Sequence, residues 1–175
     1  IADGIIVPGG ACSPADLRRV VDDVETAARA AGRDLSRFPV LYYVGVAVAA
    51  DRATALDDAR GGAARRVMNF VGPGRRCPPE LEALRPEMER VAAGYDYREH
   101  LKSHVAHVEP VSDALVEAVS IAGTPDQVGR RLNALERAIG DSNVTLFLRP
   151  DGRGKRRSFE LLVRGVQRGQ TNLTP

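Results

Sequence analysis

The sequence of 175 residues contains no tryptophan, only two cysteines and no long apolar run. A transmembrane helix needs about 20 mostly apolar residues in succession, so we expect no contact with a membrane. The mean hydropathy is −0.22, with 43% hydrophobic and 27% charged residues. This composition is typical of a folded globular chain and disfavours intrinsic disorder.

An excess of charge of one sign is also missing. The 25 Lys and Arg residues stand against 23 Asp and Glu residues, which gives a formal net charge of +2. Nonspecific nucleic-acid binding depends on a clustered positive surface that neutralises phosphates. We therefore expect no nucleic-acid partner.

The number and spacing of the cysteines indicate the cellular compartment in which the protein works. Cys12 and Cys77 lie far apart in the sequence, and two scattered cysteines are typical of reduced thiols in a cytoplasmic protein. A disulfide between them stays an alternative. No basic segment followed by an apolar one marks a secretory signal at the N-terminus, and no methionine precedes Ile1. We expect a cytoplasmic protein of which this chain is a piece.

Apolar periodicity predicts one domain, residues 1–175, in which strands and helices alternate. The longest apolar segment, residues 39–49, does not alternate with polar residues, which is typical of a parallel strand covered on both faces. Local signals place the helix starts: Ser13 before Pro14, Asp51, Ser112, and Thr124 with Gln127 as a capping box. The predicted strands are residues 1–7, 39–49 and 143–148. The predicted helices with both ends defined are 13–31, 95–108 and 124–139. Further helices are predicted to begin at 51, where Gly61-Gly62 weakens the helix, at 80, with a kink at Pro86, at 112, and after a polar loop at 149–157.

This order predicts an α/β fold with right-handed βα units and a parallel sheet. Three twisted parallel strands cannot cover themselves, and a closed (β/α)8 TIM barrel typically needs about 250 residues. The length therefore fits a partial barrel: about the last three βα units, with a helical insertion before the final strand.

Two segments resemble the luciferase-like family of flavin- and deazaflavin-dependent oxidoreductases, which are TIM barrels. Ala2-Asp3-Gly4-Ile5-Ile6 is similar to the entry into the sixth strand of that family. Residues 121–128, Ile-Ala-Gly-Thr-Pro-Asp-Gln-Val, followed by Asn143-Val144-Thr145-Leu146, are similar to its last Gly-Thr-Pro helix and closing eighth strand. Gly32-Arg33 before the seventh strand also agrees. The turn at residues 138–142 departs from the family pattern.

The resemblance implies an oxidoreductase, of the monooxygenase, reductase or dehydrogenase type, that transfers hydride between a flavin-type cofactor and a small organic substrate. The cofactor would be deazaflavin F420 or FMN. The family loop that cradles the cofactor phosphate follows the fifth strand and would precede Ile1. The resemblance therefore implies either a homo-oligomer or a missing N-terminal half, and it names no catalytic residue.

Chemistry in a (β/α)8 barrel takes place at the carboxyl ends of the strands. Gly9 and Gly10 join the first predicted strand to a helix N-terminus, where free N–H groups favour an anion. The alternative is a tight turn in which the glycines only supply backbone freedom. Cys12 lies near the same helix start, which could lower its pKa. No base stands beside it, so we interpret Cys12 as incidental.

All three histidines lie within eight residues. On a helix, His100 and His104 would be neighbours one turn apart, with Tyr97 close by. A zinc site would need further ligands, so no metal site is predicted. Tyr97, His100 and His104 are instead candidates for lining the cofactor or substrate pocket; a solvated helix face is the alternative.

Arg149 follows the last predicted strand. Its planar guanidinium could hold a carboxylate, a phosphate or the acidic tail of a deazaflavin. The alternative is a surface ion pair with Asp151, which would contribute little.

Two hypotheses of function remain open at this point. The chain belongs to a flavin-type oxidoreductase, or it is a non-catalytic half-barrel that pairs with another chain because its apolar strands need covering. A truncated, inactive paralogue is a further alternative.

Overall fold

The computed structural model describes residues 4–36, 38–100, 102, 105–151 and 155–171, and in the last helix the side chains of residues 156–164. Strands alternate with helices, as the sequence predicts. The strands are β1 (Ile5–Pro8), β2 (Val40–Val48), β3 (Ile121–Gly123) and β4 (Val144–Pro150). The helices are α1 (Pro14–Ala30), α2 (Arg52–Val67), α3 (Arg85–Ala93), α4 (Asp113–Val119), α5 (Pro125–Ile139) and α6 (Lys155–Thr171), with short 3₁₀ helices η1 (Pro79–Leu84), η2 (Tyr97–Glu99) and η3 (Ala106–Val108).

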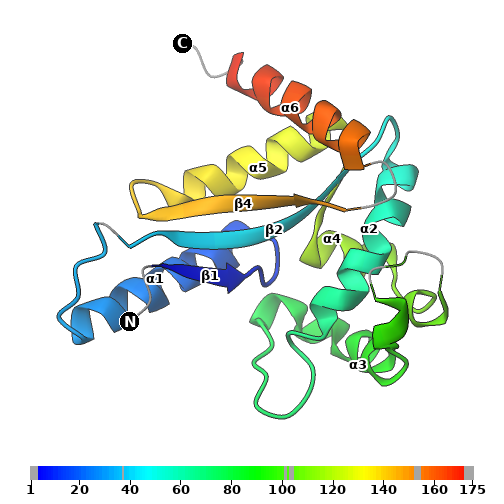
Figure 1. The fold of residues 1–175 in the computed structure, drawn as a ribbon, viewed down its shortest axis with the longest axis horizontal. Coiled ribbons are helices and arrows are strands. Elements are labelled where there is room, and N and C mark those ends of the chain that lie inside the picture. Colours follow the sequence, from blue (N-terminus) through cyan, green and yellow to red (C-terminus); the bar gives the residue numbers. More distant parts are fainter. Residues whose placement is uncertain (1–3, 37, 101, 103–104, 152–154, 172–175) are drawn as a thin grey trace.

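The long strand β2 is the centre of a parallel sheet (Figure 1). Its first half pairs with β1 and its last three residues pair with β3, both along the same edge. Strand β4 pairs along the opposite edge, from Val40 opposite Val144 to Val46 opposite Pro150. Because every pair is parallel, the carboxyl ends of the strands point the same way.

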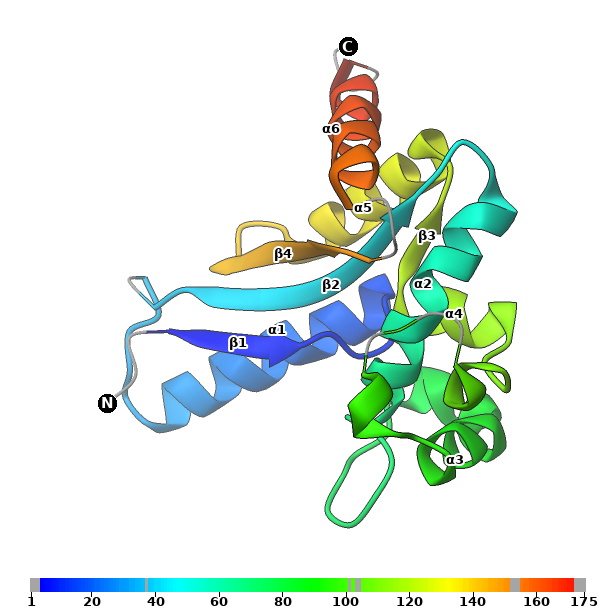
Figure 2. The ribbon, with the colours of Figure 1, turned by 45° about the vertical axis from the view of Figure 1, so that its right-hand side comes forward.

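One face of the sheet is covered by helices. Tyr42, Val44 and Val46 of β2 are fully buried there, because they pack against apolar side chains of α1, α5 and α6. Figure 2 shows α1 and α5 behind the sheet. The helix residues in this core are Leu17 and Val21 of α1, Val128, Leu132 and Leu135 of α5, and Leu162 of α6.

A second core lies in a helical lobe, residues 52–119, beyond the carboxyl end of β1 (Figure 2). Leu56, Met88 and Leu115, from three different helices, are fully buried in it. Ala47 of β2 belongs to the same core. The lobe is therefore attached to the carboxyl end of the sheet, where a parallel α/β fold carries its site.

On the opposite face of the sheet, away from α1 and α5, the residues that the structure describes provide no such cover at the amino end. The strand register places Ile6, Leu41, Tyr43, Thr145 and Phe147 on this face, which we call the open face. Ile6 is 59% exposed and Phe147 is 46% exposed. Large apolar side chains at this level of exposure mark a surface that suits a further layer of protein.

The helix starts are confirmed. The side chains of Ser13, Asp51 and Ser112 each accept a hydrogen bond from the first turn of α1, α2 and α4. Thr124 and Gln127 form the predicted capping box of α5. Pro86 divides its predicted helix into η1 and α3, since it stands in the first turn of α3.

Four predictions about elements are wrong. The described residues form four strands, because the three-residue strand β3 precedes α5. Residues 95–108 are not one helix: the described part has only the 3₁₀ turns η2 and η3. Gly61 and Gly62 do not weaken α2, which continues to Val67 with both glycines buried in it. The polar loop is also shorter than predicted, since β4 continues to Pro150 and α6 begins at Lys155.

Within the residues that the structure describes, no helix has both the length and the apolar character needed to cross a membrane. The thiols of Cys12 and Cys77 are both free and buried, so the alternative of a disulfide between them is wrong.

Candidate functional site

Polar groups gather at the carboxyl ends of β2 and β4, on the side of the open face. Arg149 of β4 lies beside Gly45 of β2 in the register. Its Nη1 donates a hydrogen bond to the hydroxyl oxygen of Tyr43 at 2.8 Å. The ring of Tyr43 in turn contacts Phe147, with 5.9 Å between ring centroids. An arginine and a tyrosine are thus fixed against each other at the edge of an apolar face.

A buried ion pair lies next to them. Nη2 of Arg66, from α2, is 2.6 Å from Oδ2 of Asp151, and Nη1 donates to Oγ of Ser120 at 2.7 Å. The side chains of Arg66 and Asp151 are only 4% and 7% exposed. Burial by itself lowers the pKa of Arg66, but the charge of Asp151 and its hydrogen bond outweigh burial and raise it. The guanidinium of Arg66 therefore keeps its charge inside the protein.

Two glycines make room for this pair. A Cβ on Gly45 would lie 1.3 Å from Nη2 of Arg66, and one on Gly62 would lie 2.6 Å from Oδ2 of Asp151. The N–H of Asp151 donates to the carbonyl of Val46 at 2.7 Å, which prolongs the pairing of β4 with β2. The guanidinium of Arg66 thus lies directly on the backbone of β2.

The charges of this site do not cancel. Asp151 neutralises Arg66, whereas Arg149 has no carboxylate partner among the residues that the structure describes. The Nε of Arg66 is buried and has no hydrogen-bond acceptor there. Cζ of Arg66 lies 6.0 Å from the ring centroid of Tyr43. The site therefore has a surplus of one positive charge and unused N–H donors, an arrangement that suits acceptor oxygens or an anion.

The predicted site residues Gly9 and Gly10 lie at the carboxyl end of β1, and both are buried. A Cβ on Gly9 would lie 2.0 Å from the carbonyl oxygen of Tyr43, and one on Gly10 would lie 2.3 Å from Oδ2 of Asp16. Close packing therefore explains both glycines, whereas the alternative of backbone freedom does not, because neither has a positive φ. Contact with a ligand stays a prediction for them.

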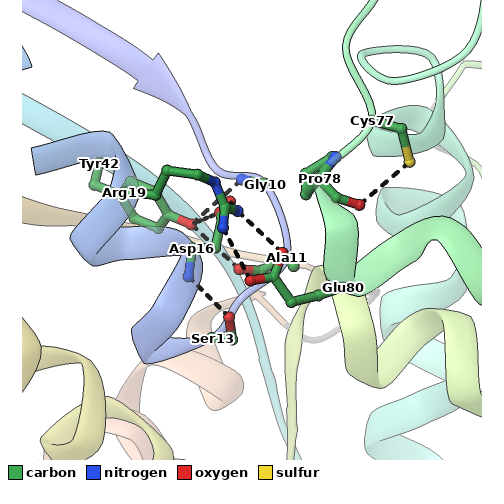
Figure 3. Close-up of polar contacts among 9 residues, drawn as sticks. All are labelled: Gly10, Ala11, Ser13, Asp16, Arg19, Tyr42, Cys77, Pro78 and Glu80. Carbon is green, nitrogen blue, oxygen red and sulfur yellow. Dashed lines mark hydrogen bonds and ion pairs between the residues drawn. The ribbon is translucent and has the colours of Figure 1, made fainter. Parts of the chain in front are cut away.

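A chain of hydrogen bonds connects the turn after β1 to β2 and α1 (Figure 3). The N–H of Gly10 donates to the hydroxyl oxygen of Tyr42 at 3.3 Å, and that hydroxyl donates to Oδ2 of Asp16 at 2.7 Å. Nη2 of Arg19 contacts Oδ1 of Asp16 at 2.5 Å and also Glu80 of the lobe at 3.0 Å. The turn after β1 is thereby connected through α1 to the helical lobe.

Burial governs the protonation of the groups in this network. It raises the pKa of the Asp16 carboxyl, although the hydrogen bond from Tyr42 and the charge of Arg19 oppose the change. It also raises the pKa of Tyr42 and raises that of the Cys12 thiol to about 11. The idea that the helix start lowers the pKa of Cys12 is therefore wrong, since desolvation is the larger effect.

The predicted histidine cluster has a different geometry. Tyr97 and His100 do not lie on one α-helix, because Tyr97 begins the turn η2 and His100 follows it in extended backbone. Their rings are nearly parallel, with 6.3 Å between centroids, and Nδ1 of His100 lies 2.7 Å from the hydroxyl of Tyr95. His104 lies outside the described residues. The prediction that Tyr97 and His100 share a helix is therefore wrong.

His107, which the site prediction did not include, is buried beneath this cluster. Its ring centroid is 4.5 Å from that of Tyr95, and its Nδ1 accepts a long hydrogen bond of 3.4 Å from the N–H of Asp96. Burial lowers the pKa of His107. Within residues 4–36, 38–100, 102, 105–151 and 155–171, no group of three His, Cys, Asp or Glu residues could hold a metal ion.

Arg149 is the predicted site residue that the structure places in a polar cluster at the sheet end. Its supposed surface pair with Asp151 is wrong, since Asp151 is buried with Arg66. Tyr43, Arg66 and Asp151 were missed. The sequence places Tyr43 inside an apolar strand and Arg66 among helix residues, and no local pattern connects positions 85 residues apart.

The parallel sheet with its site at the carboxyl ends defines an α/β protein of the class from which TIM barrels are built. The model of the luciferase-like monooxygenase family matches residues 1–142. The chain belongs to the luciferase-like monooxygenase family, which confirms the resemblance drawn from its motifs.

Two relatives bear on the class of reaction. The chain is 28% identical over 177 aligned residues to the 5,10-methylenetetrahydromethanopterin reductase of Archaeoglobus fulgidus, which covers 95% of this chain and 48% of that protein. The structure of the coenzyme F420-dependent tetrahydromethanopterin reductase from Methanopyrus kandleri is similar with a TM-score of 0.67 and 25% identity, over 96% of this chain and 45% of that one.

A second structure shows likeness of fold alone. An F420-dependent secondary alcohol dehydrogenase in complex with an F420–acetone adduct matches with a TM-score of 0.61 and 15% identity, over 94% of this chain and 43% of that one. The chain thus spans about half the length of the relatives that it matches. The α/β fold with a parallel sheet, similar to luciferase-like TIM barrel proteins, is confirmed.

Proposed function

We propose that the polypeptide to which these residues belong is an oxidoreductase that transfers hydride between a flavin-type cofactor, deazaflavin F420 or FMN, and a small organic substrate. The observation that carries this proposal is the membership of residues 1–142 in the luciferase-like family. The reductases of A. fulgidus and M. kandleri favour the reductase or dehydrogenase type over the monooxygenase type. The expected cytoplasmic location stays a prediction, and the two free thiols support it.

The residues at the ends of β2 and β4 fit the polar part of such a cofactor. F420 and FMN both carry carbonyl and phosphate oxygens, and the N–H groups of Arg149 need acceptors of that kind. When bound, the cofactor supplies the hydride chemistry. The part of this chain is to bind and orient: Arg149 holds an oxygen, Tyr43 fixes Arg149, and the apolar ring of Phe147 keeps water away.

We also propose that the chain is the C-terminal part of a (β/α)8 barrel. Exposed apolar side chains support this, since they lie where further strands and helices of a barrel would pack. Ile6 and Phe147 are on the open face, and Phe159 and Val163 of α6 are 55% and 38% exposed. Lobe residues 52–119 would be the predicted insertion before the final strand.

Cofactor binding to the complete polypeptide tests the proposed function. F420 and FMN are titrated separately and followed by their own fluorescence; we expect saturable binding of one of them. An adenine nucleotide in excess should not displace it, because that competitor shares the phosphate but not the isoalloxazine-type ring. If neither F420 nor FMN binds, the proposed function is wrong.

A non-catalytic half-barrel that pairs with a second chain is the other candidate, and the exposed side chains of the open face favour it. Size-exclusion chromatography of residues 1–175 distinguishes the two candidates. A stable complex of defined size that binds no flavin supports obligatory pairing, whereas a well-behaved monomer speaks against it.

A further inference from the structure

The guanidinium groups of Arg66 and Arg149 both lie near Tyr43, but within the part of the chain that the structure describes only that of Arg66 forms an ion pair with a carboxylate. Arg66 is buried and forms its ion pair with Asp151. Arg149 is half-buried, and its one hydrogen bond among the described residues goes to the neutral hydroxyl of Tyr43. Charged groups withdrawn from water are usually paired. Arg149 therefore lacks a counter-charge that a ligand could supply.

The hydrogen bond with Tyr43 also leaves Arg149 ready for such a ligand. It uses Nη1 and, because the Tyr43 ring contacts Phe147 at 5.9 Å, it fixes the plane of the guanidinium. The edge formed by Nε and Nη2 stays available for two parallel hydrogen bonds. That edge matches the oxygen spacing of a carboxylate or a phosphate.

No carboxylate within the described part of the chain forms an ion pair with Arg149. Its neighbour in the register is Gly45, whose missing side chain is replaced by the guanidinium of Arg66. Asp151, two positions later in the chain, is engaged by Arg66 and lies against Gly62. Since Asp151 neutralises Arg66, the one unmatched charge of this site, as far as the structure describes the chain, is that of Arg149.

We propose that Arg149, fixed by Tyr43, is the binding site for an anionic oxygen group, a phosphate or a carboxylate, at the carboxyl ends of β2 and β4. The proposal deepens the proposed function, because the anion belongs either to the cofactor or to the substrate of the same reaction. Arg66 and Asp151 are positioning residues, since they shape the surface on which Arg149 lies.

Titration of the complete polypeptide with inorganic phosphate, and separately with acetate, tests the site without any redox reaction. The ring resonances of ¹³C-labelled tyrosine are followed by NMR, and Tyr43→Phe assigns the signal of Tyr43. We expect a saturable shift of that signal. Arg149→Gln should weaken binding at least about tenfold, since hydrogen bonds to charged groups are among the stronger ones. Arg149→Lys should retain part of it.

Arg157→Gln is the matched control, because it removes the same charge from an exposed position of α6. It should leave phosphate binding unchanged. The fold of every variant is checked by far-UV circular dichroism. Should Arg149→Gln fail to fold, Tyr43→Phe serves in its place. Because this variant lacks the Tyr43 signal, its phosphate binding is measured by isothermal titration calorimetry against the wild type. We expect it to weaken binding severalfold, because the guanidinium loses its anchor.

Comparison of ligands with and without a phosphate distinguishes the two sources of the anion. If the cofactor supplies it, Arg149→Gln weakens binding of FMN or F420 but not of riboflavin or a deazaflavin without the phosphate tail. If the substrate supplies it, cofactor affinity is unchanged and phosphate binds together with the cofactor. Either result supports an anion site.

The proposal is overturned if phosphate and acetate leave the Tyr43 signal unmoved in a folded polypeptide. It is also overturned if Arg157→Gln weakens binding as much as Arg149→Gln, because the attraction would then be diffuse. Phosphate binding without any flavin binding would overturn the proposed function and leave the anion site standing.

Discussion

At the scale of single residues, the space left by Gly45 determines how the site is built. A side chain there would meet Nη2 of Arg66 at 1.3 Å, and both the buried ion pair and the neighbourhood of Tyr43 depend on that guanidinium. No local sequence pattern marks Gly45 as important, because the reason for a glycine there is Arg66, which lies on α2.

Replacement of Gly45 by alanine should therefore destabilise the protein by about 2 kcal/mol or more, since overpacking forces Arg66 out of its place. Urea unfolding measures the change in the free energy of unfolding. Gly94→Ala is the control, because its Cβ would lie 3.8 Å from the nearest atom, the carbonyl oxygen of Arg90. A Gly45→Ala variant as stable as Gly94→Ala would contradict this account.

Cys12 gives a prediction about pH. Its pKa is about 11 in the folded protein against 9.0 as the ordinary value. Between these values the unfolded chain loses the thiol proton first, so the folded state binds more protons and stability falls as pH rises. The loss amounts to about 2–3 kcal/mol for a shift of this size. Urea unfolding at pH 8 to 11 should show a shallower fall for Cys12→Ala than for the wild type; equal slopes would contradict the prediction.

At the scale of elements, the helix starts were predictable and the contacts between elements were not. Ser13 and Thr124 cap helices within three residues of themselves, so a short stretch of sequence contains the whole signal. Strand β3 has only three residues, too few for a period to appear. The sequence predicted a helix over residues 95–108, whereas the described part of this segment forms only the 3₁₀ turns η2 and η3. Tyr95, Val105 and Val108 pack on the lobe core there rather than follow local preference.

The same distinction applies to the site. Arg149 was predictable because it follows a recognisable strand. Its partner Tyr43 is 106 residues away in sequence, and Arg66 is 85 residues from Asp151. Such contacts depend on the strand register and on the position of α2, which only the folded structure determines.

The ion pair that joins α2 to the end of β4 gives an element-scale prediction. Arg66→Met leaves the buried carboxylate of Asp151 without its partner and should cost about 3–5 kcal/mol of stability. In the double variant Arg66→Met with Asp151→Leu, the loss should be smaller than the sum of the two single losses. A double-mutant cycle from urea unfolding measures this coupling. Additive losses would mean that the pair does not tie the two elements together.

At the scale of the whole molecule, one side of the sheet is complete and the other is not. Helices α1, α5 and α6 bury one face, whereas Ile6 and Phe147 on the open face meet solvent. The chain spans about half the length of its relatives. In the barrel that we propose, the rest of the protein would cover the open face; in the alternative, a second chain would.

Residues 1–175 produced alone should associate with themselves as concentration rises, because exposed apolar patches favour contact between copies. Phe147→Ser should reduce this association, seen as a later elution in size-exclusion chromatography at the same concentration. Thr145→Ser, an exposed position on the same face, serves as the control and should elute like the wild type. Equal elution volumes of the wild type, Phe147→Ser and Thr145→Ser would show that the open face does not mediate self-association.

Strand β2 acquires its neighbours at very different times during translation. It pairs with β1, which precedes it, but Val40 also lies opposite Val144, and the lobe and α5 are synthesised between them. After β2 has left the ribosomal exit tunnel, the edge that pairs with β4 therefore stays unpaired until β4 has been synthesised. Because contacts so distant in sequence form slowly, the nascent chain is exposed to wrong pairing in that interval, and chaperone binding to β2 would protect it.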